Sequence, residues 1–109
     1  MSTFNIKRGD LLPAFSFRLR NGDGTPPDLT GATVALNMRD ARTKALVITR
    51  GAVVVVDQPD ASVRYDWTAP DTAVVGLFAA EFEVVFADGR AATYPNRGFI
   101  PVLIHDDLG

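Results

Sequence analysis

The chain has no cysteine and only one histidine among its 109 residues. A small domain without disulfides fits a reducing compartment better than a secreted one. No apolar run approaches the roughly 18 residues of a membrane span, and the first ten residues lack the apolar segment of a signal peptide. We therefore expect a protein that is neither exported by a signal peptide nor inserted in a membrane.

The chain also lacks a large excess of charge of either sign, because 11 basic and 13 acidic residues give a formal net charge of −2. Binding to nucleic acid needs a clustered basic face, so we expect no nucleic-acid partner. Arg18 and Arg20 alternate with Phe17 and Leu19, which is typical of the solvent face of a strand. Apolar residues make up 47% of the chain, which excludes disorder. The length predicts a single domain over residues 1–109.

The hydrophobic pattern repeats every two residues, which predicts strands and not helices. The expected strands cover residues 15–20, 33–39, 46–49, 53–57, 63–67, 77–86, 90–94 and 99–104. Residues 46–49 and 53–57 should pair around Arg50-Gly51, and Asp88-Gly89 predicts a two-residue type I′ hairpin turn. The only helical signal is one short turn near residues 70–75. Short strands with turns between them predict an all-β, immunoglobulin-like sandwich of two antiparallel sheets with seven or eight strands.

The last expected strand, residues 99–104, is apolar on both faces. Pro101 has no N–H to donate to a neighbouring strand, so an edge strand or a bulge is expected there. An apolar edge is usually covered by another surface. We therefore take Phe99, Pro101 and Leu103 as a candidate partner interface.

No set of residues predicts catalysis, a metal or a cofactor. His105 lies beside Asp106 and Asp107, but three adjacent residues on an extended, solvated tail do not converge on one metal ion. Glu81 and Glu83 share one face of a strand about 6.5–7 Å apart, a spacing compatible with glycoside hydrolysis. Outward acidic residues on a long strand are more often solubilising, so we expect no enzyme, although a hydrolase stays a minor alternative.

Other short motifs favour turns or the core. The segment Asn21-Gly22-Asp23-Gly24 resembles part of a calcium loop but lacks the closing ligands, so it predicts a turn. Arg8-Gly9-Asp10 matches the tripeptide that integrins bind, a match that is frequent by chance. Tyr65 and Trp67 alternate with charged residues and should point inward. If they and Tyr94 instead faced solvent in a row, they would form a platform for carbohydrate.

The order of several segments resembles the N-terminal domain of the phage baseplate upper protein family, over nearly the whole chain. The segments that match are Gly9–Pro13, Asp23–Val34, Met38–Asp40, Val63–Trp67, Asp71-Thr72, Gly76–Val84, Phe86–Gly89 and Thr93–Pro95. The resemblance implies an immunoglobulin-like structural module of a phage or prophage tail or baseplate, assembled in the host cytoplasm. Its partners would be other phage structural proteins, with self-association as a second option. The alternative function is a carbohydrate-binding β-sandwich module.

Overall fold

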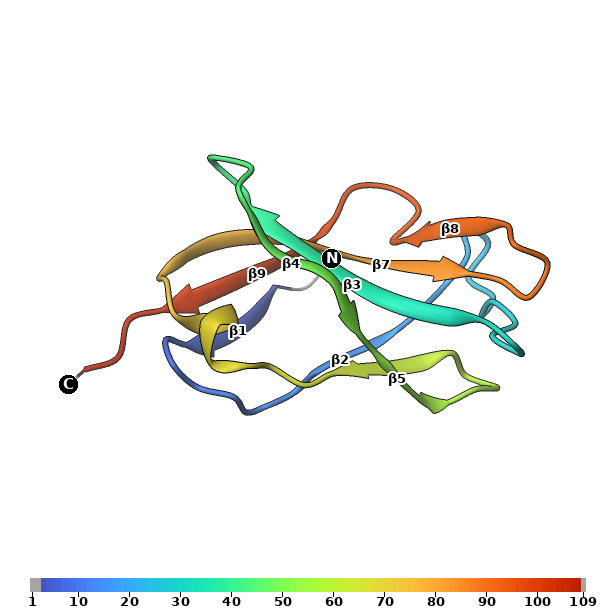
Figure 1. Ribbon diagram of the computed structural model, residues 1–109, viewed down its shortest axis with the longest axis horizontal. Helices are drawn as coiled ribbons and strands as arrows, with labels where there is room; N and C mark the ends of the chain where they lie inside the picture. Colours follow the sequence, from blue (N-terminus) through green and yellow to red (C-terminus); the bar gives the residue numbers. More distant parts are fainter. Residues whose placement is uncertain (1–2, 109) are drawn as a thin grey trace.

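The computed structural model describes residues 3–108, which form short strands joined by turns (Figure 1). The strands are β1 (Phe4–Lys7), β2 (Phe15–Arg18), β3 (Thr33–Asp40), β4 (Leu46–Ala52), β5 (Val54–Asp57), β6 (Ser62–Tyr65), β7 (Gly76–Val85), β8 (Ala91–Tyr94) and β9 (Ile100–His105). A single turn of 3-10 helix, η1 (Ala69–Thr72), lies close to the helical turn predicted near residues 70–75. No helical segment in the described part of the chain is long enough to cross a membrane.

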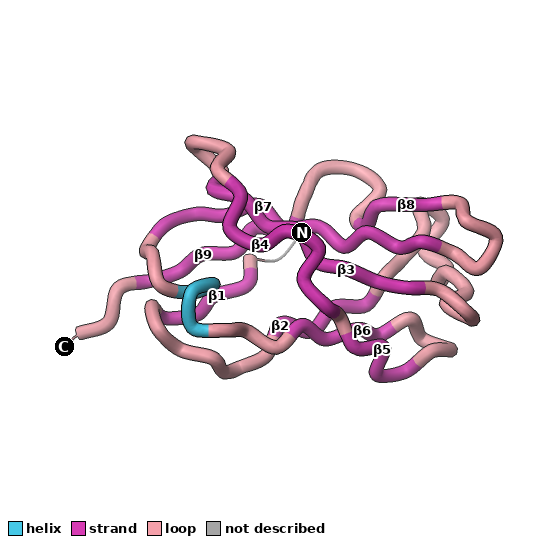
Figure 2. The backbone as a smooth tube through the Cα atoms, viewed as in Figure 1, coloured by secondary structure: helices cyan, strands magenta, loops and turns pink. Residues whose placement is uncertain are grey.

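The strands form two sheets that lie one above the other (Figure 2). The larger sheet has the order β1-β9-β7-β3-β4, with β8 also paired to β7, and the smaller has the order β2-β6-β5. The predicted two-sheet, all-β sandwich is confirmed, with nine strands in residues 3–108 in place of seven or eight. One pairing is parallel, between β1 and β9, whereas the prediction was of antiparallel sheets.

The core lies between the sheets and follows from the alternation along β7. Phe78, Ala80, Phe82 and Val84 all point inward and are buried. The ring of Phe82 lies 5.5 Å from that of Phe15 on the facing sheet. Period two therefore assigned the two faces of β7 correctly, because successive side chains of a strand point to opposite sides.

The segment from β4 to β5 passes from the larger sheet to the smaller one, which can be followed in Figure 1. The predicted pairing of residues 46–49 with 53–57 is therefore wrong. β4 pairs with β3, and β5 pairs with β6. At Arg50 the backbone has a positive φ of 54°, and its N–H donates to Oδ1 of Asn37 at 2.8 Å. The next residue is glycine, because a Cβ at Gly51 would lie 2.7 Å from a ring carbon of Tyr65.

The hairpin between β7 and β8 was predicted, but its turn differs. Phe86 and Arg90 pair through a backbone hydrogen bond of 2.8 Å, so three residues form the loop. Gly89 has a positive φ of 88°, whereas a type I′ turn needs positive φ at both Asp88 and Gly89. The N–H of Gly89 donates to the carbonyl of Phe86 at 2.9 Å, as in a turn followed by a left-handed residue.

β9 is neither an edge strand nor bulged at Pro101, so that prediction is wrong. It lies between β7 and β1. The sequence analysis missed β1, because its alternation extends over only four residues. The pairs with β1 begin at Val102, so Pro101 precedes the β1 ladder and its missing N–H removes no bond to β1.

Candidate functional site

A buried polar cluster joins β6 to the turn before β7. The hydroxyl of Tyr65 donates to Oδ2 of Asp71 at 2.7 Å, and the backbone N–H of Thr68 donates to the same oxygen at 2.8 Å. Thr72 is buried next to Asp71, and its hydroxyl donates to the carbonyl of Asp10 at 3.0 Å. The contacts of Tyr65 and Thr72 join the corner to β6 and to the segment after β1, whereas the contact of Thr68 lies within the corner. This cluster therefore stabilises the fold.

Burial raises the pKa of the Tyr65 phenol, and the hydrogen bond to Asp71 raises it further. Burial also raises the pKa of Tyr94. A buried phenolate would be poorly solvated, so both groups stay neutral in the folded domain.

The two tyrosines should therefore resist ionisation at alkaline pH while the domain is folded. The stability linked to their raised pKa values is fully present below about pH 10, the pKa of an unfolded tyrosine. It is lost as the pH rises above that value, because the unfolded chain then gains by ionising. Ultraviolet absorbance of tyrosinate measures the ionisation as the pH rises, and circular dichroism recorded in parallel shows whether the domain is still folded. Tyr65→Phe should remove its part of the alkaline loss. Ionisation of both tyrosines near pH 10 in a still-folded domain would contradict the expectation.

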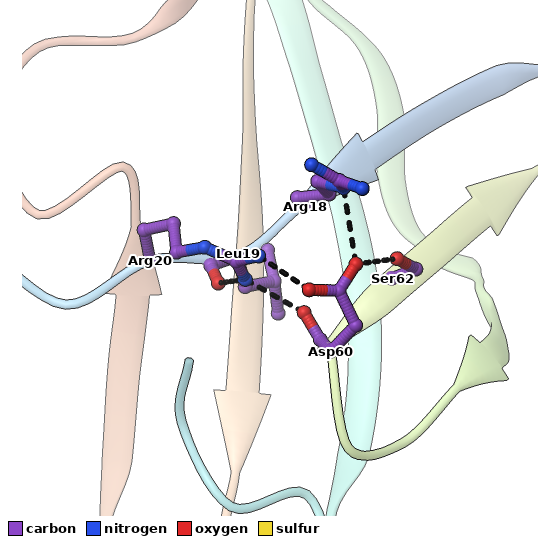
Figure 3. Close-up of polar contacts among 5 residues, drawn as sticks. All are labelled: Arg18, Leu19, Arg20, Asp60 and Ser62. Carbon is purple, nitrogen blue, oxygen red and sulfur yellow. Dashed lines mark hydrogen bonds and ion pairs between the residues drawn. The ribbon is translucent and has the colours of Figure 1, made fainter. Parts of the chain in front are cut away.

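A second polar cluster, drawn in Figure 3, holds the end of β2 to the turn before β6. Arg18 pairs through Nε with Oδ2 of Asp60 at 3.0 Å, and Arg20 forms an ion pair with Oδ1 of the same carboxylate. The Ser62 hydroxyl donates to Oδ2 of Asp60 at 2.8 Å. This hydrogen bond, followed by the one from Arg20, lowers the pKa of Asp60. Arg20 also donates to the backbone carbonyl of Asp60, so these arginines hold a turn in place.

The histidine considered for a metal lies in a strand and not on a solvated tail. His105 ends β9, and its Nε2 lies 2.8 Å from Oδ1 of Asn5 on β1. Asp106 and Asp107 face Arg8 instead, with N–O distances of 2.8 and 3.9 Å. Within residues 3–108, no three His, Asp or Glu side chains are grouped so that they could hold a metal ion.

The aromatic side chains considered for carbohydrate binding are buried. The Trp67 indole N–H donates to the carbonyl of Pro13 at 3.1 Å, and the Tyr94 hydroxyl donates to Oδ1 of Asn21 at 2.8 Å. Tyr65 is buried in the cluster with Asp71. A stacking platform needs exposed rings, so the prediction of a carbohydrate-binding module as the alternative function is wrong.

The short motifs near the N-terminus lie in turns. The carboxylate of Asp23 accepts hydrogen bonds from the backbone and hydroxyl of Thr25, so it stabilises its own turn. Gly9 lies between Arg8 and Asp10 with a φ of 82°, and its N–H donates to the carbonyl of Thr72.

The outer surface of the larger sheet has a group of apolar side chains, which we call the apolar face. It comprises Leu46, Leu77, Ala79, Phe99, Pro101 and Leu103. Ala79 lies opposite Pro101 and Leu77 lies opposite Leu103, and side chains opposite each other on paired strands share a face. Leu46 is 67% exposed, Leu77 46% and Phe99 45%. Leu46, Ala79 and Phe99 line a hollow of about 440 Å³ together with Asn37, Arg39 and Glu81.

The structure thus places the three candidate interface residues on one surface. Phe99, Pro101 and Leu103 point outward, whereas Ile100, Val102 and Ile104 between them are buried. The sequence analysis missed the other half of the apolar face, which comes from β4 and β7. Leu77 and Ala79 occupy outward positions of β7 by the same alternation that placed Phe78 inward. Their apolar side chains at outward positions of the strand could have identified them as part of this face.

The two glutamates lie on this outer surface, but their surroundings differ. Glu83 pairs with Arg50 at 3.7 Å, whereas Glu81 lines the hollow. Arg39 lies on the same surface, because it pairs in register with both Ala79 and Leu46. The polar side chains that line this hollow are therefore one cation, one carboxylate and the amide of Asn37.

Comparison with known proteins shows the fold and no family. No family model matches the chain, and no curated protein matches it. Among solved structures, the chain is similar to the crystal structure of CopC from Methylosinus trichosporium OB3b, with a TM-score of 0.56 and 15% identity. The similarity covers 100% of this chain and 89% of that one.

This similarity corrects the predicted function. The resemblance implied a structural module of a phage particle, but the fold is instead shared with CopC, so that prediction is wrong. None of these comparisons tests the resemblance to the baseplate family or the virion location that it implied. Both stay predictions. At 15% identity the similarity supports the two-sheet β-sandwich and nothing finer.

Proposed function

We propose that this domain works by binding another protein surface through the apolar face, and not by catalysis. The observation behind the proposal is that outward positions of the adjacent strands β7 and β9 hold apolar side chains, next to a hollow that Leu46, Ala79 and Phe99 line. The outer face of an antiparallel sheet is ordinarily polar, because water covers it. Contiguous exposed apolar surface is typical of an interaction site.

The energetic case rests on the exposed side chains. Full burial of a leucine or phenylalanine side chain is worth about 1.5–3 kcal/mol, and Leu46, Leu77 and Phe99 are each about half exposed or more. Ala79 lies between Arg39 and Pro101 on the adjacent strands and is only 9% exposed. Water therefore has little access to the centre of the face, which matches the fully buried core of a protein interface.

The polar residues that could serve catalysis have structural partners elsewhere. Asp71 accepts hydrogen bonds from Tyr65 and Thr68, and Glu83 pairs with Arg50. His105 contacts Asn5 at the far end of β9. These contacts favour binding over chemistry as the work of the domain.

Site-specific photocross-linking tests this proposal. A benzophenone side chain in place of Phe99 should form a discrete covalent adduct with a protein in the cells that produce the domain. The same group in place of Val56 is the matched control, because Val56 is 58% exposed on β5 in the other sheet. We expect an adduct from position 99 and none from position 56. An adduct from position 56 alone, or none from position 99, would refute the proposal.

A further inference from the structure

The charges on the apolar face point to a specific partner. Arg39 lies opposite Ala79 on β7, and Glu81 is two residues further along the same strand. They are therefore diagonal neighbours, with Cα atoms about 7–8 Å apart. Within residues 3–108, neither Arg39 nor Glu81 takes part in an ion pair.

This pair of charges restricts what can cover the face. A charge that is buried without a partner costs several kcal/mol. A covering surface that brings a carboxylate to Arg39 and a cation to Glu81 avoids this cost. Glu83 needs no cation from the covering surface, because Arg50 already pairs with it. The complementary surface therefore has one charge of each sign in exchanged places, set in an apolar surround.

A second copy of the chain has this surface. In a twofold symmetric contact, if one residue contacts another across the interface, the reverse contact also forms. A twofold axis in the contact plane, midway between Arg39 and Glu81, places the arginine of each copy against the glutamate of the other. Ala79 lies opposite Arg39 and two residues from Glu81, so it is close to this axis and the two copies also meet at their apolar Ala79 side chains.

We infer that the domain forms a symmetric homodimer through the apolar face, with two Arg39–Glu81 ion pairs between the copies. The inference rests on the proposed function, since it names the partner for that same face. It also assigns a role to Glu81, which the sequence analysis considered only for hydrolysis or solubility.

Charge reversal with mixing tests the inference. Sedimentation equilibrium of the wild-type domain should show a dimer. Arg39→Glu and Glu81→Arg should each raise the dissociation constant at least about tenfold, because like charges then face each other across the interface. An equimolar mixture of the two variants should dimerise again, since each ion pair is re-formed between unlike copies. Asp57→Arg, an exposed acidic position on β5, is the control and should leave the dimer unchanged.

Milder variants separate lost charge pairing from disturbed folding. Arg39→Gln and Glu81→Gln should each weaken the dimer, because neither homodimer then has an Arg39–Glu81 ion pair. Mixing these two variants should restore the dimer only in part, since the mixed dimer re-forms one of the two ion pairs. Circular dichroism melting confirms that each variant is folded. A wild-type domain that is monomeric up to about 1 mM, or a mixture of reversed variants that fails to dimerise, overturns the inference.

The outcomes also distinguish this inference from the proposed function. If the wild type is monomeric but a benzophenone at position 99 cross-links a different protein, the dimer is refuted and the proposed function stands. If the wild type is monomeric and position 99 forms no adduct, both are refuted.

Discussion

Replacing Phe82 by alanine should lower the free energy of unfolding by about 3–5 kcal/mol. The Phe82 side chain is fully buried at the centre of β7, and its ring lies 5.5 Å from that of Phe15 and 5.6 Å from that of Phe17. Both neighbours belong to β2 in the facing sheet, so truncation leaves a cavity where the two sheets meet. Urea denaturation, followed by tryptophan fluorescence, measures the loss.

The matched control is Phe99→Ala, because Phe99 is 45% exposed on the outer surface. We expect this change to lower the free energy of unfolding by less than about 1 kcal/mol in the monomer. The measurement therefore uses a protein concentration below the dissociation constant of the proposed dimer. Equal losses for the two variants would contradict the inward position of Phe82 in β7 and the outward position of Phe99 just before β9. The same pair also separates core packing from surface binding, since only Phe99→Ala should affect association.

Replacing Asp71 by alanine should cost about 2–4 kcal/mol, because one buried and one partly buried donor lose their acceptor. The donors are the hydroxyl of Tyr65 and the backbone N–H of Thr68, which both bond to Oδ2 of Asp71. The effect should be large even though the variant leaves the apolar core intact. Thermal and urea denaturation at neutral pH measure it.

A double-mutant cycle isolates the contact between the two side chains. Tyr65→Phe removes the hydroxyl and keeps the ring, and the coupling between this change and Asp71→Ala should be about 0.5–3 kcal/mol. Asp71→Asn is the milder control, since an amide oxygen can still accept from Thr68. If the losses from Tyr65→Phe and Asp71→Ala simply add, the hydrogen bond between them does not stabilise the corner.

About half of the apolar face could be predicted from the sequence. Phe99, Pro101 and Leu103 stood out because they lie in a strand that is apolar on both sides. Leu77 and Ala79 were missed, because the prediction for β7 considered only its long inward row of apolar residues. Leu46 could not be placed at all, since it joins the face only through the pairing of β4 with β3.

Local patterns thus determined which side chains point inward along most strands, where most turns fall, and that the chain forms a two-sheet β-sandwich. A side chain's face depends on its own strand, and the period of two is visible in neighbouring residues. Only the tertiary structure decided that β4 and β5 belong to different sheets and that β1 covers the edge of β9. It also brought Arg39 and Glu81 together on one apolar surface. Strand pairing joins residues that are distant in the chain, and an exposed backbone edge can pair with almost any strand. The partner of each strand therefore cannot be predicted from any single segment.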